Sequence, residues 1–401
     1  MRILLASDFF PPVRGGLETY VDNLAAELAD RGHDVHVATL TEHPSPQRGG
    51  VQTHPVSTTS AKLVTHQDGD RPFHPPWPDP RARRVLAQLL RRIKPDVVHA
   101  HSWLGVSLPK SVPAPLILTA HDYALACQRR TMLRWGNEPC PGPSVRACLP
   151  CGAQEYGLIK SAVIGGGTAI GRRLLHPQRV LTLSEFVRSR LLPYVSAPVD
   201  VIPGFVPRHL EAGHEPPVEG RYVMYAGDAG AHKGLETLLE VWQRWQPADL
   251  RLLVATTRPA DLPTIPGVVA RTLSPAGVMA GWRNALAAVV PSKWDEPFGM
   301  VAIEALTVGT PVIAHRVGAL PEIVRDQDNG LLVDAGDPAN LMAALRHISE
   351  HASLREQLSS GARRSASAYS PDAVVPRIEA VYQEAVEQAR RVPRPRSLIT
   401  S

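Results

Sequence analysis

Two glutamates, Glu296 and Glu304, lie in an apolar stretch with seven residues between them and could together bind a polar ligand. Pro297 suits the first position of a helix, so we expect Glu296 just before that helix and Glu304 inside it. Backbone N–H groups at a helix start favour an anion such as a diphosphate, while sugar hydroxyls can donate to a carboxylate. An ordinary capped helix whose Glu304 faces solvent is the alternative. The expected anion-binding N–H groups belong to Phe298, Gly299 and Met300.

A second candidate site is the glycine-rich segment 227–234, which ends in Lys233 and Gly234. It follows an apolar run that begins at Tyr222 and precedes a helical pattern, so its backbone could approach a phosphate closely. Its spacing differs from that of a Walker loop. A lysine exposed to solvent is the alternative. Gly15 and Gly16 offer a similar, weaker signal.

Short apolar runs alternate with helical patterns in two series, which is typical of parallel sheets covered by helices. In the first series we expect strands at 3–7 and 35–40 around a helix at 18–28. The second series opens with a strand at 222–227 and a helix at 235–245. The predicted fold class is therefore α/β, with two Rossmann-like doubly wound domains that face a cleft and bind ligands at the carboxyl ends of their strands.

Proline and glycine between residues 203 and 217 predict a linker between these domains. We expect an N-terminal domain at 1–205, a C-terminal domain at 218–370 and a final helix at 371–390 that packs back on the N-terminal domain. The segment 44–80, rich in Pro, His, Thr and Ser, is expected to be a surface excursion.

The composition of the 401 residues is that of a globular protein, with 44% hydrophobic and 20% charged residues. The net charge is +5, but the arginines are scattered and aromatic residues make up only 5%, which argues against a nucleic-acid reader. Asp8 interrupts the first apolar run before a signal-peptide core has formed, and no run has the length of a membrane span. We expect a cytoplasmic protein and leave open a peripheral contact with the inner face of a membrane.

All four cysteines fall within 25 positions of one another, inside a predicted insertion at 122–156. Four thiolates can hold zinc, and the last two cysteines have the two-residue spacing of zinc sites. A structural zinc, disulfides and free thiols are the alternatives, disulfides being disfavoured in the cytosol. The residues are Cys127, Cys140, Cys148 and Cys151.

Taken together, these motifs resemble those of the family 4 retaining glycosyltransferases, which have the GT-B fold and belong to the group 1 type. Glu296 and Glu304 match the E-x7-E motif of that family. The Gly-Gly turn, the strand that ends at His121, the Lys233 loop and the segment 317–324 occur in the family's order. The resemblance covers nearly the whole chain. It implies transfer of a hexosyl group from a nucleoside diphosphate sugar, with retention and without an obligatory metal or other cofactor.

The resemblance also assigns roles to individual residues. It implies that Glu296 holds the donor sugar, that Glu304 holds the ribose and that Lys233 neutralises the leaving diphosphate. His121 would lie beside the reacting carbon, and Ser184 would line the cleft. The implied catalytic residues are His121, Lys233 and Glu296. The implied donor-binding residues are Gly15, Gly16, Gly227, Lys233, Glu296, Phe298, Gly299, Met300 and Glu304.

One position departs from the family pattern, because Asp228 stands where an arginine usually follows the glycine. Either Lys233 and the helix start suffice for the diphosphate, or another arginine such as Arg14 or Arg316 replaces it, or catalysis is weak. An inactive nucleotide-sugar-binding protein and a GT-B nucleotide-sugar epimerase are therefore kept as alternatives. The base and sugar of the donor stay open, as does the acceptor, which can be a small molecule or a lipid-linked glycan.

Overall fold

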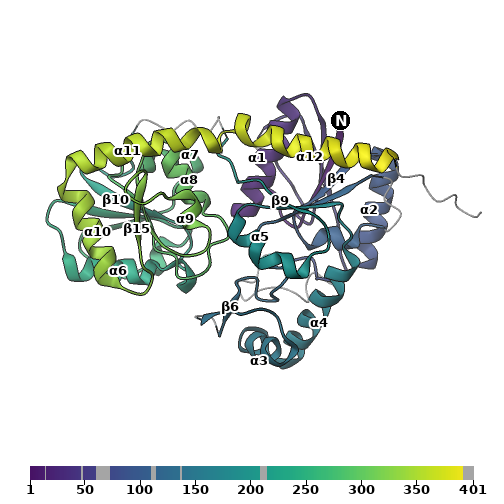
Figure 1. Ribbon diagram of the computed structural model, residues 1–401, viewed down its shortest axis with the longest axis horizontal. Coiled ribbons are helices and arrows are strands. Elements are labelled where there is room, and N and C mark those ends of the chain that lie inside the picture. The colour runs from purple at the N-terminus through teal and green to yellow at the C-terminus, as the bar shows by residue number, and fades with distance from the viewer. Residues whose placement is uncertain are drawn as a thin grey trace, which may run out of the picture.

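The computed structural model describes residues 1–13, 15–46, 48–59, 73–109, 114–135, 138–207 and 215–391. The chain forms two lobes, each built on a parallel sheet with helices on both faces (Figure 1). The predicted fold class is confirmed.

The sheet of the N-terminal lobe has seven strands in the order β3-β2-β1-β4-β5-β8-β9, all parallel. Its central strands are apolar at nearly every position because helices cover both faces. The strands are β1 (Arg2–Ser7), β2 (Asp34–Thr39), β3 (Val51–Pro55), β4 (Val97–Ala100), β5 (Leu116–Ala120), β8 (Arg179–Thr182) and β9 (Val199–Val201). The helices are α1 (Gly16–Asp30), α2 (Pro80–Ile93), α3 (Val145–Tyr156), α4 (Leu158–Leu174) and α5 (Glu185–Leu191).

The sheet of the C-terminal lobe has six parallel strands in the order β12-β11-β10-β13-β14-β15. They are β10 (Tyr222–Ala226), β11 (Arg251–Ala255), β12 (Val268–Arg271), β13 (Ala288–Val290), β14 (Val312–His315) and β15 (Gly330–Val333). The helices are α6 (Leu235–Trp245), α7 (Pro275–Asn284), α8 (Met300–Thr307), α9 (Leu320–Ile323), α10 (Pro338–Glu350) and α11 (Ala352–Ala366).

Several helices begin with a capping residue followed by proline. Asp79 accepts hydrogen bonds from the N–H groups of Arg81 and Ala82, and Pro80 opens α2. Ser274 and Asp337 cap α7 and α10 in the same way. The side-chain oxygen satisfies N–H groups that have no partner inside the helix, and proline has no N–H to satisfy.

The last helix, α12 (Pro371–Arg391), crosses from the C-terminal lobe to the N-terminal lobe, as predicted (Figure 1). It packs against α1 and β4, and its Tyr382 is completely buried there. Arg31, which directly follows α1, pairs with Glu379 of α12 at 3.4 Å. Helix α12 therefore contributes to the core of the first lobe.

The segment 44–80 and the predicted linker at 203–217 connect the main elements of the fold. The segment 44–80 is more than a surface excursion, because it contributes the edge strand β3 and the start of α2. Polar and half-exposed residues make up most of β3, so its apolar signal is weak. Residues 60–72 and residues 208–214 of the predicted linker lie outside the described residues. The exact domain boundaries therefore stay a prediction.

Candidate active site

The structure brings Lys233 and Glu296 together. The Lys233 ammonium lies 3.1 Å from both carboxylate oxygens of Glu296. Ser292 and Trp294 also donate to this carboxylate, each at 2.9 Å. The Trp294 ring lies under the ammonium, whose nitrogen is 5.0 Å from the ring centre. Glu296 is thus almost fully hydrogen-bonded inside the protein, as a nearly buried carboxylate must be.

Two loops of the C-terminal lobe create this arrangement. Lys233 ends a short 3-10 turn just before α6, and the N–H of Lys293 donates to the carbonyl of His232 at 2.8 Å. The loop at Gly318 lies against the backbone of Glu296 on its other side. A Cβ atom at Gly318 would lie 2.3 Å from the nitrogen of Glu296, and φ there is 55°, so only glycine fits.

The helix that follows Glu296 starts later than predicted. Pro297 does not occupy the first helical position, because α8 begins at Met300 and Gly299 is its N-cap. Gly299 has φ of 103°, which glycine tolerates and which turns the chain sharply into the helix. Phe298 and Gly299 therefore precede α8, and the Phe298 side chain is buried against Tyr369 instead.

Glu304 lies inside α8, four residues after its start, where the indole N–H of Trp282 donates to it at 3.4 Å. Burial raises the pKa of Glu304 to about 7, and this hydrogen bond opposes the rise only in part. Glu304 does not face open solvent as the alternative reading required, because it is only partly exposed. A carboxyl group in this setting gains from hydroxyl donors brought by a ligand.

Gly15 and Gly16 lie at the start of α1, at the edge of the first lobe where β1 ends. Gly15 is the N-cap of α1 and Gly16 its first residue, directly after the loop that follows β1.

Asp228, at the position where the family has arginine, lies in the turn between β10 and Lys233. Gly227 follows β10, and Asp228 accepts a hydrogen bond from the N–H of Gly230 at 2.8 Å, so Asp228 stabilises this turn. Arg316 lies 3.6 Å from Asp326 and Asp334, and Arg14 lies outside the described residues.

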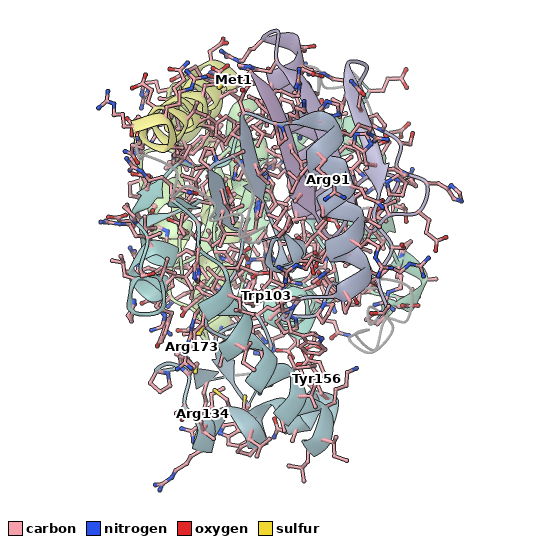
Figure 2. The ribbon with its side chains drawn as sticks, turned by 90° about the vertical axis from the view of Figure 1, so that its right-hand side faces the viewer. Met1, Arg91, Trp103, Arg134, Tyr156 and Arg173 are labelled. Atoms are coloured by element: carbon pink, nitrogen blue, oxygen red, sulfur yellow. The ribbon has the colours of Figure 1, made fainter. Side chains whose placement is uncertain are left out.

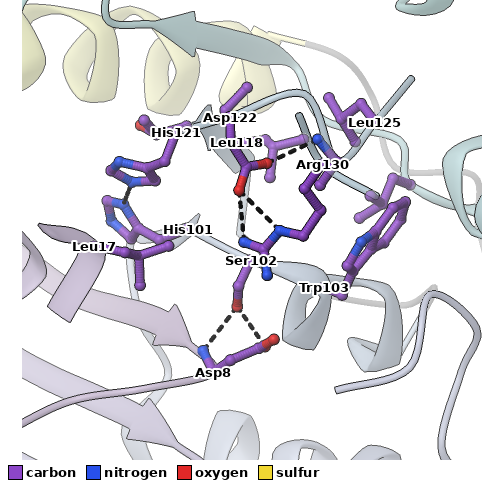
Figure 3. Close-up of a pocket in the computed structure, with 14 residues that line it drawn as sticks. Asp8, Leu17, His101, Ser102, Trp103, Leu118, His121, Asp122, Leu125 and Arg130 are labelled. Carbon is purple, nitrogen blue, oxygen red and sulfur yellow. Dashed lines mark hydrogen bonds and ion pairs between the residues drawn. The ribbon is translucent and has the colours of Figure 1, made fainter. Parts of the chain in front are cut away.

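A pocket opens at the carboxyl ends of the N-terminal strands, and His121 lies in its wall (Figure 3). His101 and His121 follow β4 and β5, and their ring nitrogens are 3.0 Å apart. Burial lowers the pKa of His121 to about 4, so this imidazole is neutral at physiological pH. Arg130 pairs with Asp122 at 2.7 Å across the same pocket. The pocket thus presents both neutral and charged hydrogen-bonding groups.

Behind the pocket, a buried hydrogen-bond chain leads to the last helix. His99 bonds the Tyr382 hydroxyl at 2.6 Å and the Thr119 hydroxyl at 2.7 Å, and all three residues are buried. Burial lowers the pKa of His99 to about 3. His99 therefore makes structural polar contacts inside the N-terminal lobe.

The pocket lies on the N-terminal lobe and the Lys233–Glu296 pair on the C-terminal lobe. Hydrogen bonds between the two lobes connect these regions. Tyr123, two residues after His121, donates to the carbonyl of Asp295 at 2.8 Å. Ser184 donates to the carbonyl of Pro297 at 2.6 Å. Glu322 accepts from the first N–H groups of α5, at 2.7 and 2.8 Å, so a carboxylate from one lobe caps a helix of the other.

The predicted zinc site is not found. Among the residues that the structure describes, no three His, Cys, Asp or Glu side chains gather closely enough to hold a metal ion. Cys127 and Cys140 pack against apolar side chains, and all four cysteines are free. Burial raises the pKa of Cys127 and Cys148, which favours the thiol over the thiolate that zinc requires.

The sequence reasoning missed the residues that hold the glutamates in place. Ser292 and Trp294 precede Glu296 by four and two residues, and Trp282 contacts Glu304 from another helix. The short distance from Trp294 to Glu296 along the chain was a usable signal. Trp282 had none, since only the packing of α7 on α8 brings it close.

Comparison with known proteins adds independent findings. Residues 14–209 match the model of Glycosyltransferase Family 4, and residues 272–365 match that of Glycosyl transferases group 1. A D-inositol 3-phosphate glycosyltransferase of Acidothermus cellulolyticus is 29% identical, over 94% of this chain and 87% of that protein. An MMP alpha-(1->4)-mannosyltransferase of Mycolicibacterium hassiacum is 28% identical, over 96% and 98%.

Solved structures agree with the fold. Sucrose-phosphate synthase from Thermosynechococcus elongatus superimposes with a TM-score of 0.72 at 18% identity, over 97% of this chain and all of the other. Anabaena HepE in complex with UDP-glucose gives a TM-score of 0.67 at 15% identity, with the same coverage. The chain is therefore a glycosyltransferase with the GT-B fold and belongs to family 4, of the group 1 type.

Proposed function

We propose that this glycosyltransferase transfers a hexosyl group from a nucleoside diphosphate sugar to a hydroxyl-bearing acceptor, with retention of configuration. The observation that carries the proposal is the Lys233–Glu296 pair, with the ammonium 3.1 Å from a carboxylate that lies four residues before the first residue of α8. A cation, a carboxylate able to accept sugar hydroxyls and the segment that leads into a helix N-terminus together suit a nucleoside diphosphate sugar. A structural neighbour, Anabaena HepE, was solved in complex with UDP-glucose, which supports this class of donor.

In the proposed reaction Lys233 neutralises the charge that grows on the departing diphosphate, and the first N–H groups of α8 assist it. Preorganised charge of this kind is usually the largest contribution to catalysis. Because a side chain supplies this charge, the proposed reaction needs no obligatory metal. Glu296 accepts hydroxyls of the donor sugar, and Glu304 accepts those of the ribose. Retention is part of the proposal because the E-x7-E spacing matches the retaining members of the family.

The pocket beside His121 is the proposed acceptor site. Its His101 has a buried ring nitrogen, Nε2, that finds no hydrogen-bond partner in the described part of the chain. A buried polar atom without a partner is costly, and an acceptor hydroxyl would satisfy it. Neutral His121 would lie on the same side, next to the reacting carbon. One relative is a D-inositol 3-phosphate glycosyltransferase, which supports a polyol as the class of acceptor.

The proposal is tested by incubating the purified protein with different nucleotide sugars and acceptors and measuring the free nucleoside diphosphate. We expect acceptor-dependent release with one class of donor. The K233Q variant should lower kcat by about 100- to 1000-fold, because one charge-stabilising donor is lost. K293Q, which changes a neighbouring exposed lysine, should retain the wild-type rate.

Other outcomes would favour the alternatives. Donor binding without turnover for any acceptor would indicate an inactive sugar-nucleotide-binding protein. Conversion of the donor into its epimer, with the sugar–phosphate bond intact, would indicate an epimerase. Product anomers of inverted configuration, seen by NMR, would contradict retention alone.

A further inference from the structure

The helical hairpin α3–α4 carries most of the large apolar side chains that are exposed in the described part of the chain. It projects from the N-terminal lobe, at the bottom of Figure 1 and Figure 2. Among the described residues, seven large apolar side chains are exposed, and all but Leu192 belong to this hairpin. Exposure reaches 88% at Val145 and 84% at Ile159. The six are Val145, Leu149, Leu158, Ile159, Val163 and Ile170. Such clustering indicates an interaction surface.

The exposed side chains of α4 form one continuous face. Ile159, Val163 and Ile170 recur at helical spacing, and the exposed residues between them on this face are Ala162, Gly166 and Ala169. The opposite face of α4 is already used, because Gly167 and Gly171 lie against Trp77 and Pro76 of the N-terminal lobe. α4 is therefore apolar on two sides, of which the protein covers one.

The charges around this face are positive. α4 contains Lys160, Arg172 and Arg173 and no acidic residue; Arg173 is exposed, and Lys160 and Arg172 are half-exposed. α3 contributes Arg146, and its one acid, Glu155, is paired with Arg129 at 2.7 Å. An apolar helix face bordered by lysine and arginine matches the interface of an anionic bilayer, where the cations reach the phosphates and the apolar side chains enter below them. A second copy of the chain would bring the same positive border and be repelled.

We propose that the exposed face of α4, assisted by α3, docks the protein on an anionic lipid bilayer. The helix lies along the surface, since none of the helices in the described ranges is long and apolar enough to cross a membrane. The hairpin is joined to the pocket wall, because Arg172 donates to the carbonyl of Leu125 at 3.2 Å and Leu175 follows α4. If the proposed acceptor site is correct, docking would present that pocket close to the lipid surface.

The test is co-sedimentation of the full chain with vesicles of phosphatidylcholine, with or without phosphatidylglycerol. We expect binding to the anionic vesicles that weakens with added salt, because screening reduces the attraction to the lipid phosphates. The triple variant I159S/V163S/I170S should bind at least about tenfold more weakly. Its unfolding temperature should stay near that of the wild type, since all three side chains are exposed.

Charge variants provide the matched control. K160E/R173E should reduce binding to anionic vesicles at least about tenfold, since each cation near the surface contributes to the attraction. R83E/R84E on α2 makes the same change of net charge at exposed positions elsewhere and should bind like the wild type. Equal loss in both pairs would mean attraction of the whole protein to the vesicle and would overturn the proposal.

Two further results would also overturn it. One is wild-type protein that does not sediment with anionic vesicles at low salt. The other is a wild-type dimer, seen by analytical ultracentrifugation, that the triple variant abolishes, because a second copy would then cover the face. Transfer to a soluble acceptor should be unchanged in the triple variant, so failure of docking and failure of the proposed reaction can be told apart.

Discussion

Glu304 should make the stability of the protein depend on pH in a way that the E304Q variant removes. Burial raises its pKa from 4.5 to about 7. The folded protein thus disfavours the ionised form, which the unfolded chain adopts freely above pH 4.5. This cost is absent below pH 4.5, grows as the pH rises toward 7 and is complete above it. Glutamine keeps the shape and carries no charge, so it removes the cost.

The size of the effect follows from the same values. A pKa raised from 4.5 to about 7 corresponds to at most about 3 kcal/mol of unfolding free energy. Because Glu304 is partly exposed, water screens the charge, and we expect about 1 to 3 kcal/mol. Urea unfolding at pH 5, 6, 7 and 8 measures it. The difference in unfolding free energy between E304Q and the wild type should increase in favour of E304Q by about 1 to 3 kcal/mol from pH 5 to pH 8.

The matched control is E240Q, which changes an exposed glutamate of α6 and should shift stability by no more than about 0.5 kcal/mol at every pH. If the curves of E304Q and wild type run parallel from pH 5 to 8, the buried carboxyl does not titrate as described and the reasoning is refuted. Donor binding gives a second readout. If Glu304 binds the ribose as proposed, the ribose hydroxyls favour its ionised form, so wild-type affinity for the donor should fall from pH 8 to 6, while that of E304Q should stay constant.

Two other substitutions test the contact of α12 with the N-terminal lobe and a contact between the two lobes. Tyr382→Phe leaves the buried Nδ1 of His99 without a partner and should lower the unfolding free energy by about 1 to 3 kcal/mol in urea titrations; an unchanged midpoint would mean that α12 docks without this bond. Ser184→Ala removes both the cap of α5 and the bond to the Pro297 carbonyl, and should lower the unfolding temperature more than Ser189→Ala does. Equal shifts in the two serine variants would show that the cap and the interface bond together contribute no more than the single bond of Ser189.

The sequence predicted the architecture well because parallel strands covered on both faces must be apolar throughout. The strand at 222–227 and the helix at 235–245 correspond to β10 and α6. The edge strand β3 was missed because half of its surface is exposed, so it lacks that continuous apolar run. Patterns of hydrophobicity therefore locate the interior of a sheet better than its edge.

The candidate site was predictable in its charged residues but not in their partners. Lys233 and Glu296 could be proposed from motifs, because each follows a strand and precedes a helix. Their distance of 3.1 Å depends on the loop at Gly318 and on the approach of two segments 63 positions apart in the chain. For the four cysteines, in contrast, the prediction from sequence spacing was wrong. Close spacing in the sequence did not bring their side chains into a metal-binding group within the described residues.

The pairing of Lys233 with Glu296 has a consequence for how a donor would bind. In the structure each charge neutralises the other, so neither is buried alone. A diphosphate would draw the Lys233 ammonium away, and Glu296 would then lose a charged partner. Ser292 and Trp294 keep two donors on the carboxylate while this happens. Sugar hydroxyls can take the place of the ammonium, so the proposed exchange leaves every charge with a partner. Glu296 would therefore keep its orientation in both states, which is the property that a positioning carboxylate needs.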